Sequence, residues 1–221
     1  GITGHREIQS QVRVGKGKIH PEHAEKRSQD AGAVAAGSTG NHDDGPLMRR
    51  VMPDFGISNA QQILLEGWQI IMLDTQVYSV PHGWLKPEQM SFLEQCLNEQ
   101  PDRYTLVCLH HNTFPVGSTW LDQHDLKNGP DLLALIERFP NVRLVLCGHV
   151  HQETDLLHNG VRFISSPSTC IQFEPLSRDF GLDSKGPGWR YLQLYADGRI
   201  ETQVHRLPAG CYIPDGAAGG Y

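Results

Sequence analysis

Two histidines, His149 and His151, stand at alternate positions after a short apolar run, an arrangement that can bring metal ligands to the end of a buried strand. The run is Val145 to Cys147, and Gly148 separates it from the first histidine. Alternate side chains of a strand point the same way, so both imidazoles should face one point if the strand continues through the turn. A neutral imidazole is the commonest metal ligand. The pattern predicts a metal site, although two neighbouring histidines can also be coincidental among the 12 of this chain.

Two further groups of polar residues lie upstream in comparable positions. Asn41 and His42 fall in a short segment of Gly, Asn and Asp, which are turn-forming residues. Such a loop can be a plain turn, or it can set an amide oxygen ligand beside a proton donor. His110 and His111 directly follow the apolar run Tyr104 to Leu109. Histidines therefore occur again at the end of a predicted buried strand.

The elements that must position these side chains alternate between strand and helix patterns. Helices are predicted over 47–53, 86–99 and 130–139, and a turn over 186–189. Strands are predicted over 61–65, 68–73, 104–109, 142–147, 161–164, 191–195 and 200–205, with Asp197-Gly198 marking the last hairpin. Polar groups at the ends of strands that alternate with helices are typical of layered α/β folds.

The chain is expected to contain one folded domain with a less regular segment at each end. Its length of 221 residues suits a single core. Residues 1–39 are polar or small and lack a sustained apolar period, so we expect an unpatterned, disordered or altered segment there. Residues 40–208 carry the domain pattern, and the Gly- and Ala-rich residues 209–221 are expected to form a loose tail.

Composition and charge exclude several classes of partner and site. The formal net charge of -6 argues against a nucleic-acid partner. No apolar run approaches the roughly 18 residues of a membrane span, and the first residues do not have the layout of a signal peptide. The 5 cysteines include no CxxC pair, so neither a disulfide framework nor a cysteine zinc site is expected. The sequence thus predicts a cytoplasmic protein without a membrane partner.

Taken together, three blocks resemble the calcineurin-like metallophosphoesterases: Gly40-Asn-His-Asp43, His110, and Gly148-His-Val-His151. Further segments resemble the class III bacterial 3′,5′-cyclic-AMP phosphodiesterase branch of that family, and the resemblance extends from Gly40 to the C-terminus. These segments are 73–76, 81–83, 120–128, 167–173 and 187–190. The resemblance implies a four-layer α/β/β/α sandwich, incomplete at the N-terminus.

The resemblance also assigns metal ligands. It implies that Asn41, His110 and His149 hold the second of two metal ions, and that His151 belongs to the first. Nitrogen and oxygen ligands of this kind suit Mn²⁺ or Fe²⁺, and Zn²⁺ is also compatible. Two ions about 3.5 to 4 Å apart clamp a phosphodiester and supply a metal-bound hydroxide for attack.

The remaining site residues are assigned to the substrate, a small cyclic nucleotide. By the same resemblance His42 is the catalytic residue, which contacts the phosphate and protonates the leaving 3′ oxygen. His111, Trp120 and His124 are expected to line the substrate pocket together with His42.

One part of the family pattern is missing. Residues 1–40 contain no Asp-x-His and no Gly-Asp block, which in the family supply the rest of the first metal site. We therefore expect at most one tightly bound ion, and we hypothesise that the chain is truncated or altered before Gly40. The loss of the opening strands would also expose strand edges, which allow pairing with a second copy of the chain.

Three functions remain open at this point. The first is hydrolysis of 3′,5′-cyclic AMP to 5′-AMP, impaired by the missing blocks. The second keeps the chemistry but changes the substrate to another small phosphodiester or a phosphomonoester. The third is a non-catalytic metal-binding fragment. The segment Trp120 to Asn128 favours the first.

Overall fold

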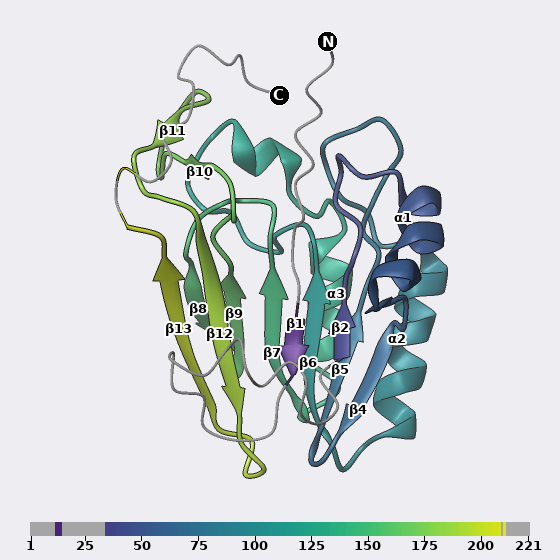
Figure 1. Ribbon diagram of the computed structural model, residues 1–221. Helices are drawn as coiled ribbons and strands as arrows, with labels where there is room; N and C mark the ends of the chain where they lie inside the picture. Colours follow the sequence, from purple (N-terminus) through teal and green to yellow (C-terminus); the bar gives the residue numbers. More distant parts are fainter. Residues whose placement is uncertain (1–11, 15–33, 209, 211–221) are drawn as a thin grey trace.

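The fold is organised around a mixed six-stranded sheet with the strand order β4-β5-β6-β7-β9-β8 (Figure 1). The computed structural model describes residues 12–14, 34–208 and 210. β5, β6, β7 and β9 run parallel, and β4 and β8 pair antiparallel at the two edges. The strands are β4 (Gln62–Leu65), β5 (Trp68–Met72), β6 (Tyr104–Leu109), β7 (Val142–Cys147), β8 (Asp155–His158) and β9 (Val161–Ser165).

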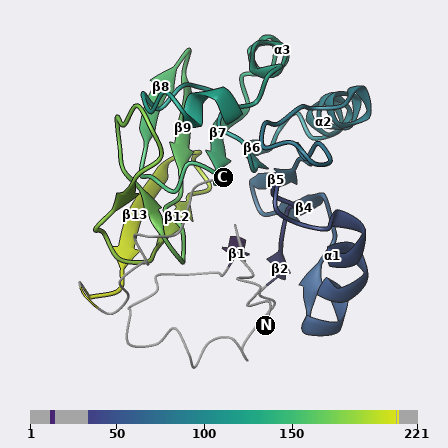
Figure 2. The same ribbon diagram turned by 90° about the horizontal axis from the view of Figure 1, so that it is seen from above.

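Two helices cover one face of this sheet (Figure 2). α2 (Pro87–Glu99) and α3 (Gly129–Ile136) each have a proline in the first turn, where its missing N–H costs nothing. Leu93 and Leu97 of α2 and Leu132 of α3 are fully buried, and they pack with Ile71, Val107 and Val145 of the sheet in one apolar core. Because both faces of the parallel strands are covered, their apolar runs are nearly continuous.

A second β layer covers the opposite face (Figures 1 and 2). The hairpin of β12 (Gly188–Leu194) and β13 (Ile200–Arg206) directs Leu192, Leu194 and Ile200 toward Leu106 and Leu144 of the sheet. Beside it lies a small sheet of β1 (Val12–Val14), β2 (Val34–Ala36) and β3 (Ile57–Ser58), flanked by α1 (Gly45–Val51) and the 3-10 helix η2 (Met52–Phe55). The short pair β10 (Gln172–Phe173) and β11 (Leu182–Asp183) lies apart. The predicted layered α/β fold class is confirmed.

Most predicted elements agree with the structure to within a few residues. The runs 104–109 and 142–147 match β6 and β7, and 86–99 matches α2. Two differences have a clear physical origin. β8 was not predicted, because Leu156 and Leu157 are both exposed on an edge strand and break the alternating pattern. The predicted turn at 186–189 is wrong at its end, since Gly188 and Trp189 already pair in β12.

The packed part of the chain begins before residue 40, where the sequence places the start of the domain. Ala36 of β2 is fully buried, and the following Thr39 is buried as well. β2 also pairs with β3 in parallel. Most of the segment 1–39 and nearly all of the predicted loose tail lie outside the described residues, so the expectations for them stay predictions.

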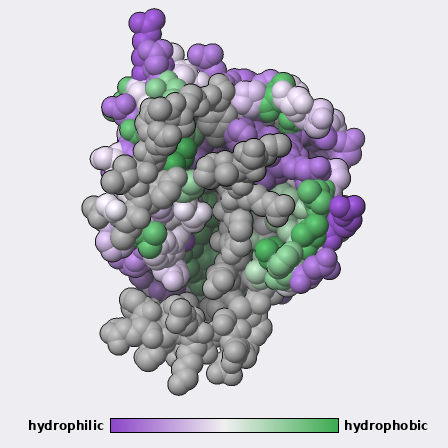
Figure 3. Space-filling model, turned by 45° about the horizontal axis from the view of Figure 1, so that its top comes forward, coloured by the Kyte–Doolittle hydropathy of each residue, from purple (hydrophilic) through white to green (hydrophobic). Residues whose placement is uncertain are grey.

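The surface combines hydrophilic areas with a hydrophobic area on the side of α1 and β4 (Figure 3). The exposed large apolar side chains of α1, η2 and β4 are Leu47, Phe55 and Leu64, respectively. Among the described residues, no helix has the length and apolar character required to span a membrane.

The packing of α2 against the sheet predicts a large effect of truncating Leu93, which is 0% exposed in the core. We expect Leu93→Ala to lower the free energy of unfolding by about 2 to 5 kcal/mol, because the substitution leaves a cavity. Leu157→Ala is the matched control, since Leu157 is 72% exposed on β8, and it should change the free energy of unfolding by less than about 0.5 kcal/mol. Urea unfolding followed by circular dichroism measures both; equal effects would contradict the described core.

Candidate functional site

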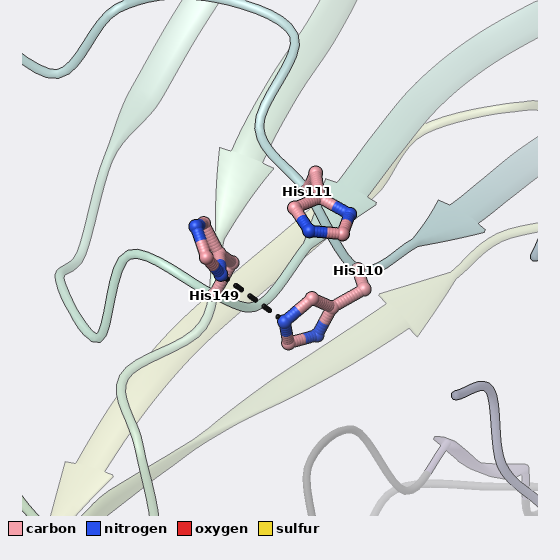
Figure 4. A group of neighbouring side chains, drawn as sticks. All are labelled: His110, His111 and His149. Carbon is pink, nitrogen blue, oxygen red and sulfur yellow. Dashed lines mark hydrogen bonds between the residues drawn. The ribbon is translucent and has the colours of Figure 1, made fainter. Parts of the chain in front are cut away.

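Three buried histidines meet at the carboxyl edge of the sheet (Figure 4). His110 and His111 directly follow β6, and His149 follows the neighbouring strand β7. The two strands are parallel and in register at Leu109 and Cys147, so their ends lie side by side. The Nδ1 atom of His149 lies 3.2 Å from Nε2 of His110. One ring nitrogen from each of the three lies within 4.8 Å of those of the other two.

The expectation that β7 continues through Gly148 is wrong. β7 ends at Cys147, and both His149 and His151 have positive φ angles, of 57° and 49°. Residues other than glycine rarely adopt this left-handed conformation, and it costs energy that the surrounding structure must offset. A tight turn rather than strand alternation therefore directs the two side chains.

The turn gives the two histidines different surroundings. His149 joins His110, whereas the ring of His151 stacks face to face on Phe173, with centroids 4.2 Å apart and an angle of 5° between the planes. His151 also forms a hydrogen bond with the backbone of Ile171. Among the described residues, the group of three that can share an ion does not include His151.

Asn41 completes a chain of contacting ligand atoms. Its Oδ1 atom lies 2.9 Å from Nε2 of His110, the nitrogen that also faces His149. The loop that carries Asn41 approaches His110 closely, because a Cβ atom on Gly40 would lie only 2.8 Å from the ring. Asn41, His110 and His149, which were predicted to hold one metal, are thus brought together.

His111, which was predicted to line the substrate pocket, contacts the protein through both ring nitrogens. Its Nε2 lies 3.1 Å from the carbonyl oxygen of Pro81, which can only accept, so Nε2 carries the proton. Its Nδ1 then accepts from the hydroxyl of Thr75 at 2.7 Å. The ring is fully buried, and a Cβ atom on Gly83 would lie 2.4 Å from it. Both nitrogens are therefore engaged with the protein, and the ring packs against His149 at 4.7 Å between centroids.

The environment keeps these imidazoles neutral. Burial is the main cause that lowers the pKa of His110 and of His149 well below the usual value, and neighbouring histidines lower both further. Burial likewise lowers the pKa of His111 to about 3 and that of His151 to about 4. Neutral imidazoles are the form that binds metal ions.

The chemistry of the group fits a divalent cation. The Nε2 atom of His149 is buried and has no hydrogen-bond partner among the described residues. A buried polar atom without a partner is rare and calls for an explanation, and an ion is one. Two imidazoles and the amide oxygen of Asn41 form a nitrogen and oxygen donor set, which suits Mn²⁺, Fe²⁺ or Zn²⁺.

His42 lies at the open side of the same site. Its side chain is exposed, yet its charge is among the causes that lower the pKa of both His110 and His151. An electrostatic effect on two buried rings requires that His42 lies near both. The predicted proton donor therefore lies on the solvent-exposed side of the buried histidines.

His124 and Trp120 border the site at the two ends of the 3-10 helix η3 (Leu121–His124), which follows β6 along the chain. His124 is among the causes that lower the pKa of His111 and of His149, so it too lies near the buried group. Trp120 lies edge-on to His124 at 6.0 Å and donates from Nε1 to the hydroxyl of Ser177. Trp120 also packs edge to face with Phe173, so it belongs to an apolar cluster as well as to the rim.

Several residues of the site had no assigned role in the sequence analysis. Thr75 and Gln76 follow β5 and contact His111 and the loop 40–43, respectively. Phe173 stacks on His151. Both groups lie in segments that carry the family resemblance, 73–76 and 167–173, and this was the available signal.

Comparison with known proteins identifies relatives that are named cyclic-nucleotide phosphodiesterases. The chain is 49% identical over 183 residues to the "3',5'-cyclic adenosine monophosphate phosphodiesterase CpdA" of Escherichia coli (strain K12). The aligned region covers 82% of this chain and 66% of the relative. It is 37% identical to the CpdA of Pseudomonas aeruginosa, over 82% of this chain and 66% of that protein. Identity to the "3',5'-cyclic-nucleotide phosphodiesterase alr5338" of Nostoc sp. (strain PCC 7120 / SAG 25.82 / UTEX 2576) is 37%, over 76% of this chain and 64% of that protein. The chain thus spans about two thirds of the length of these relatives.

The family model for calcineurin-like phosphoesterases matches residues 24–153, which is more than half of the chain. The matched range includes the loop of Asn41, the end of β6 and the turn of His149 and His151. The chain belongs to the calcineurin-like phosphoesterase family.

Proposed function

We propose that this chain is a metal-dependent phosphodiesterase that hydrolyses 3′,5′-cyclic AMP to 5′-AMP. The observation that carries the proposal is the contact chain from the partly buried Asn41 to the buried His110 and His149, at the carboxyl edge of the sheet. The names of its relatives, which are cyclic-nucleotide phosphodiesterases, support the choice of substrate.

In this proposal Asn41, His110 and His149 hold one divalent ion, with Mn²⁺ or Fe²⁺ preferred and Zn²⁺ also compatible with the donors. His151 belongs to a second, weaker position. A divalent ion, when bound, polarises the phosphoryl oxygen and lowers the pKa of a coordinated water. The described carboxylates near the loop have other contacts: Asp43 accepts from the backbone N–H of Gly40, and Asp74 accepts from the hydroxyl of Thr39. We therefore expect no more than one tightly bound ion.

The residues on the open side act on the substrate. Water attacks the phosphorus, the bond from phosphorus to the 3′ oxygen breaks, and His42 donates a proton to that oxygen. His124 and Trp120 contact the nucleotide from the rim. His111 holds the ring of His149 from behind, through its own bonds to Thr75 and Pro81.

Two alternatives rest on the same site. The substrate can be another small phosphodiester or a phosphomonoester, since the metal ligands contact the phosphate and not the base. A non-catalytic metal-binding fragment is the other alternative. We further propose a cytoplasmic location, because four of the cysteines in the described residues are free thiols, which a reducing compartment preserves.

Metal stoichiometry provides the first test. Calorimetric titration with Mn²⁺ should give a single tight ion per chain. His149→Ala should weaken Mn²⁺ binding by at least roughly 10- to 100-fold, because the loss of a residue that only supports a metal ligand already has an effect of that size. His158→Ala is the matched control. His158 is the last residue of β8 and pairs with Val161, the first residue of β9, so it lies at the end of the sheet away from the site and its loss should leave binding unchanged. Two tight sites, or equal binding by both variants, would contradict the assigned ligands.

Substrate hydrolysis provides the second test. The Mn²⁺-loaded chain should hydrolyse 3′,5′-cyclic AMP, and His42→Ala should lower kcat about 10²- to 10⁴-fold, the usual contribution of a positioned proton donor. His158→Ala again serves as the control and should retain activity. Hydrolysis of bis-p-nitrophenyl phosphate without hydrolysis of cyclic AMP would favour another phosphoester. A metal-loaded chain that cleaves neither would favour the non-catalytic fragment.

A further inference from the structure

Gln76 bridges the two ends of the loop that carries Asn41 and His42. Its side-chain Nε2 donates to the carbonyl oxygen of Gly40 at 2.8 Å and, through a short hydrogen bond, to that of Asp43. Asn41 and His42 are the two residues between these carbonyls. One carboxamide therefore closes the loop around both of them.

The loop is also bonded to itself, and these bonds depend on the same ends. The backbone N–H of Gly40 donates to Oδ2 of Asp43 at 2.8 Å, and the N–H of Asp43 donates to the carbonyl of Gly40 at 3.1 Å. The carbonyl of Gly40 therefore accepts two bonds, one from within the loop and one from Gln76. The amide of Gln76 connects this closed loop to the end of β5, as Asn41 connects it to His110 after β6.

Gln76 is itself held in place by the end of β5. Its backbone N–H donates to Oδ1 of Asp74 at 2.9 Å, and the same oxygen accepts from the hydroxyl of Thr39 at 2.8 Å. The backbone N–H of Asp74 donates to Oε1 of Gln89 on α2 at 2.8 Å. Through Asp74, Gln76 is thus connected to Thr39, which precedes the loop, and to Gln89 in the helix layer.

Space around the carboxamide is also restricted. A Cβ atom on Gly45, at the start of α1, would lie 3.0 Å from Oε1 of Gln76. The amide plane therefore fits between the loop and the first turn of α1. A side chain of similar length without N–H donors could occupy the space but could not join the two carbonyls.

We propose that Gln76 is a positioning residue that holds the loop 40–43 in place, and thereby sets Asn41 against His110 and His42 over the buried histidines. It touches neither the metal ligands nor the substrate directly and acts through the carbonyl groups of Gly40 and Asp43. The functional part of this inference rests on the proposed phosphodiesterase activity, but the structural part does not. Gln76 lies in the segment 73–76, which resembles the family but was given no role in the sequence analysis.

Hydrogen exchange measured by mass spectrometry tests the structural part. Gln76→Met keeps the length but removes both donors, and Gln76→Glu replaces the donors by an acceptor that faces two carbonyl oxygens. Both should speed exchange of the amides in 40–43 by at least about tenfold, the factor expected for two ordinary hydrogen bonds. Exchange in α2 and β6, and the melting temperature, should stay as in the unchanged chain. Gln193→Met, on the exposed face of β12, is the matched control for Gln76→Met and should leave exchange in 40–43 unchanged.

Unchanged exchange in 40–43 for Gln76→Met would overturn the inference. Faster exchange throughout the chain with a lower melting temperature would also overturn it, because it would mark a general contribution to stability. Local acceleration limited to the loop would support it.

Metal binding and kinetics test the functional part. Gln76→Glu should weaken Mn²⁺ binding and lower kcat for cyclic AMP by about 10- to 100-fold, as loss of a ligand's support does, while KM changes little. Full Mn²⁺ affinity and kcat despite a loosened loop would contradict a positioning role. If the unchanged chain hydrolyses no cyclic AMP, the proposed activity fails, and the exchange and Mn²⁺ measurements still decide the role of Gln76.

Discussion

The parallel pairing of β5, β6 and β7 is the constraint on which the site depends. Met72 pairs with Cys108, and Leu109 with Cys147, so the residues that follow all three strands emerge at one edge of the sheet. The support residues 74–76, the histidines 110 and 111, and the turn 148–151 come from these three ends. The loop 40–43 reaches the site from another layer. This explains why the loop has the additional anchors that the strand ends do not need.

The site also contains an energetic tension. Several imidazoles lie close together, and neighbouring histidines add to the effect of burial in lowering the pKa of His110 and of His149. Neutral rings avoid charge repulsion but still need partners for their buried nitrogens. His111 obtains two partners from the protein, whereas Nε2 of His149 has none among the described residues. His111 therefore has the contacts of a supporting residue, whereas His149 has a ring nitrogen suited to bind a metal ion.

Much of this arrangement is predictable from sequence, for identifiable reasons. The strands before His110 and His149 are continuous apolar runs buried on both faces, and the stripe of α2 has a clear helical period, so burial alone marks them. The backbone at His149 and His151 could not be predicted, because only the surrounding structure makes a left-handed conformation acceptable for histidine. The side-chain contacts of His111 and Gln76 could not be predicted either. Their partners, Pro81 and Gly40, are 30 and 36 positions away, and backbone carbonyls leave no mark in the sequence.

Gly40 and Gly83 have a consequence for how this site can change. Each brings its backbone against a histidine ring so closely that one added carbon would collide, with His110 in the first case and His111 in the second. The inner wall of the site is therefore backbone, which single substitutions cannot remodel without displacing a ring. Under the proposed function, variation in the substrate would come from the opposite side, where His42, Trp120 and His124 contribute side chains. Substitutions on that side can change the site without displacing His110 or His111, whereas substitutions at Gly40 or Gly83 cannot.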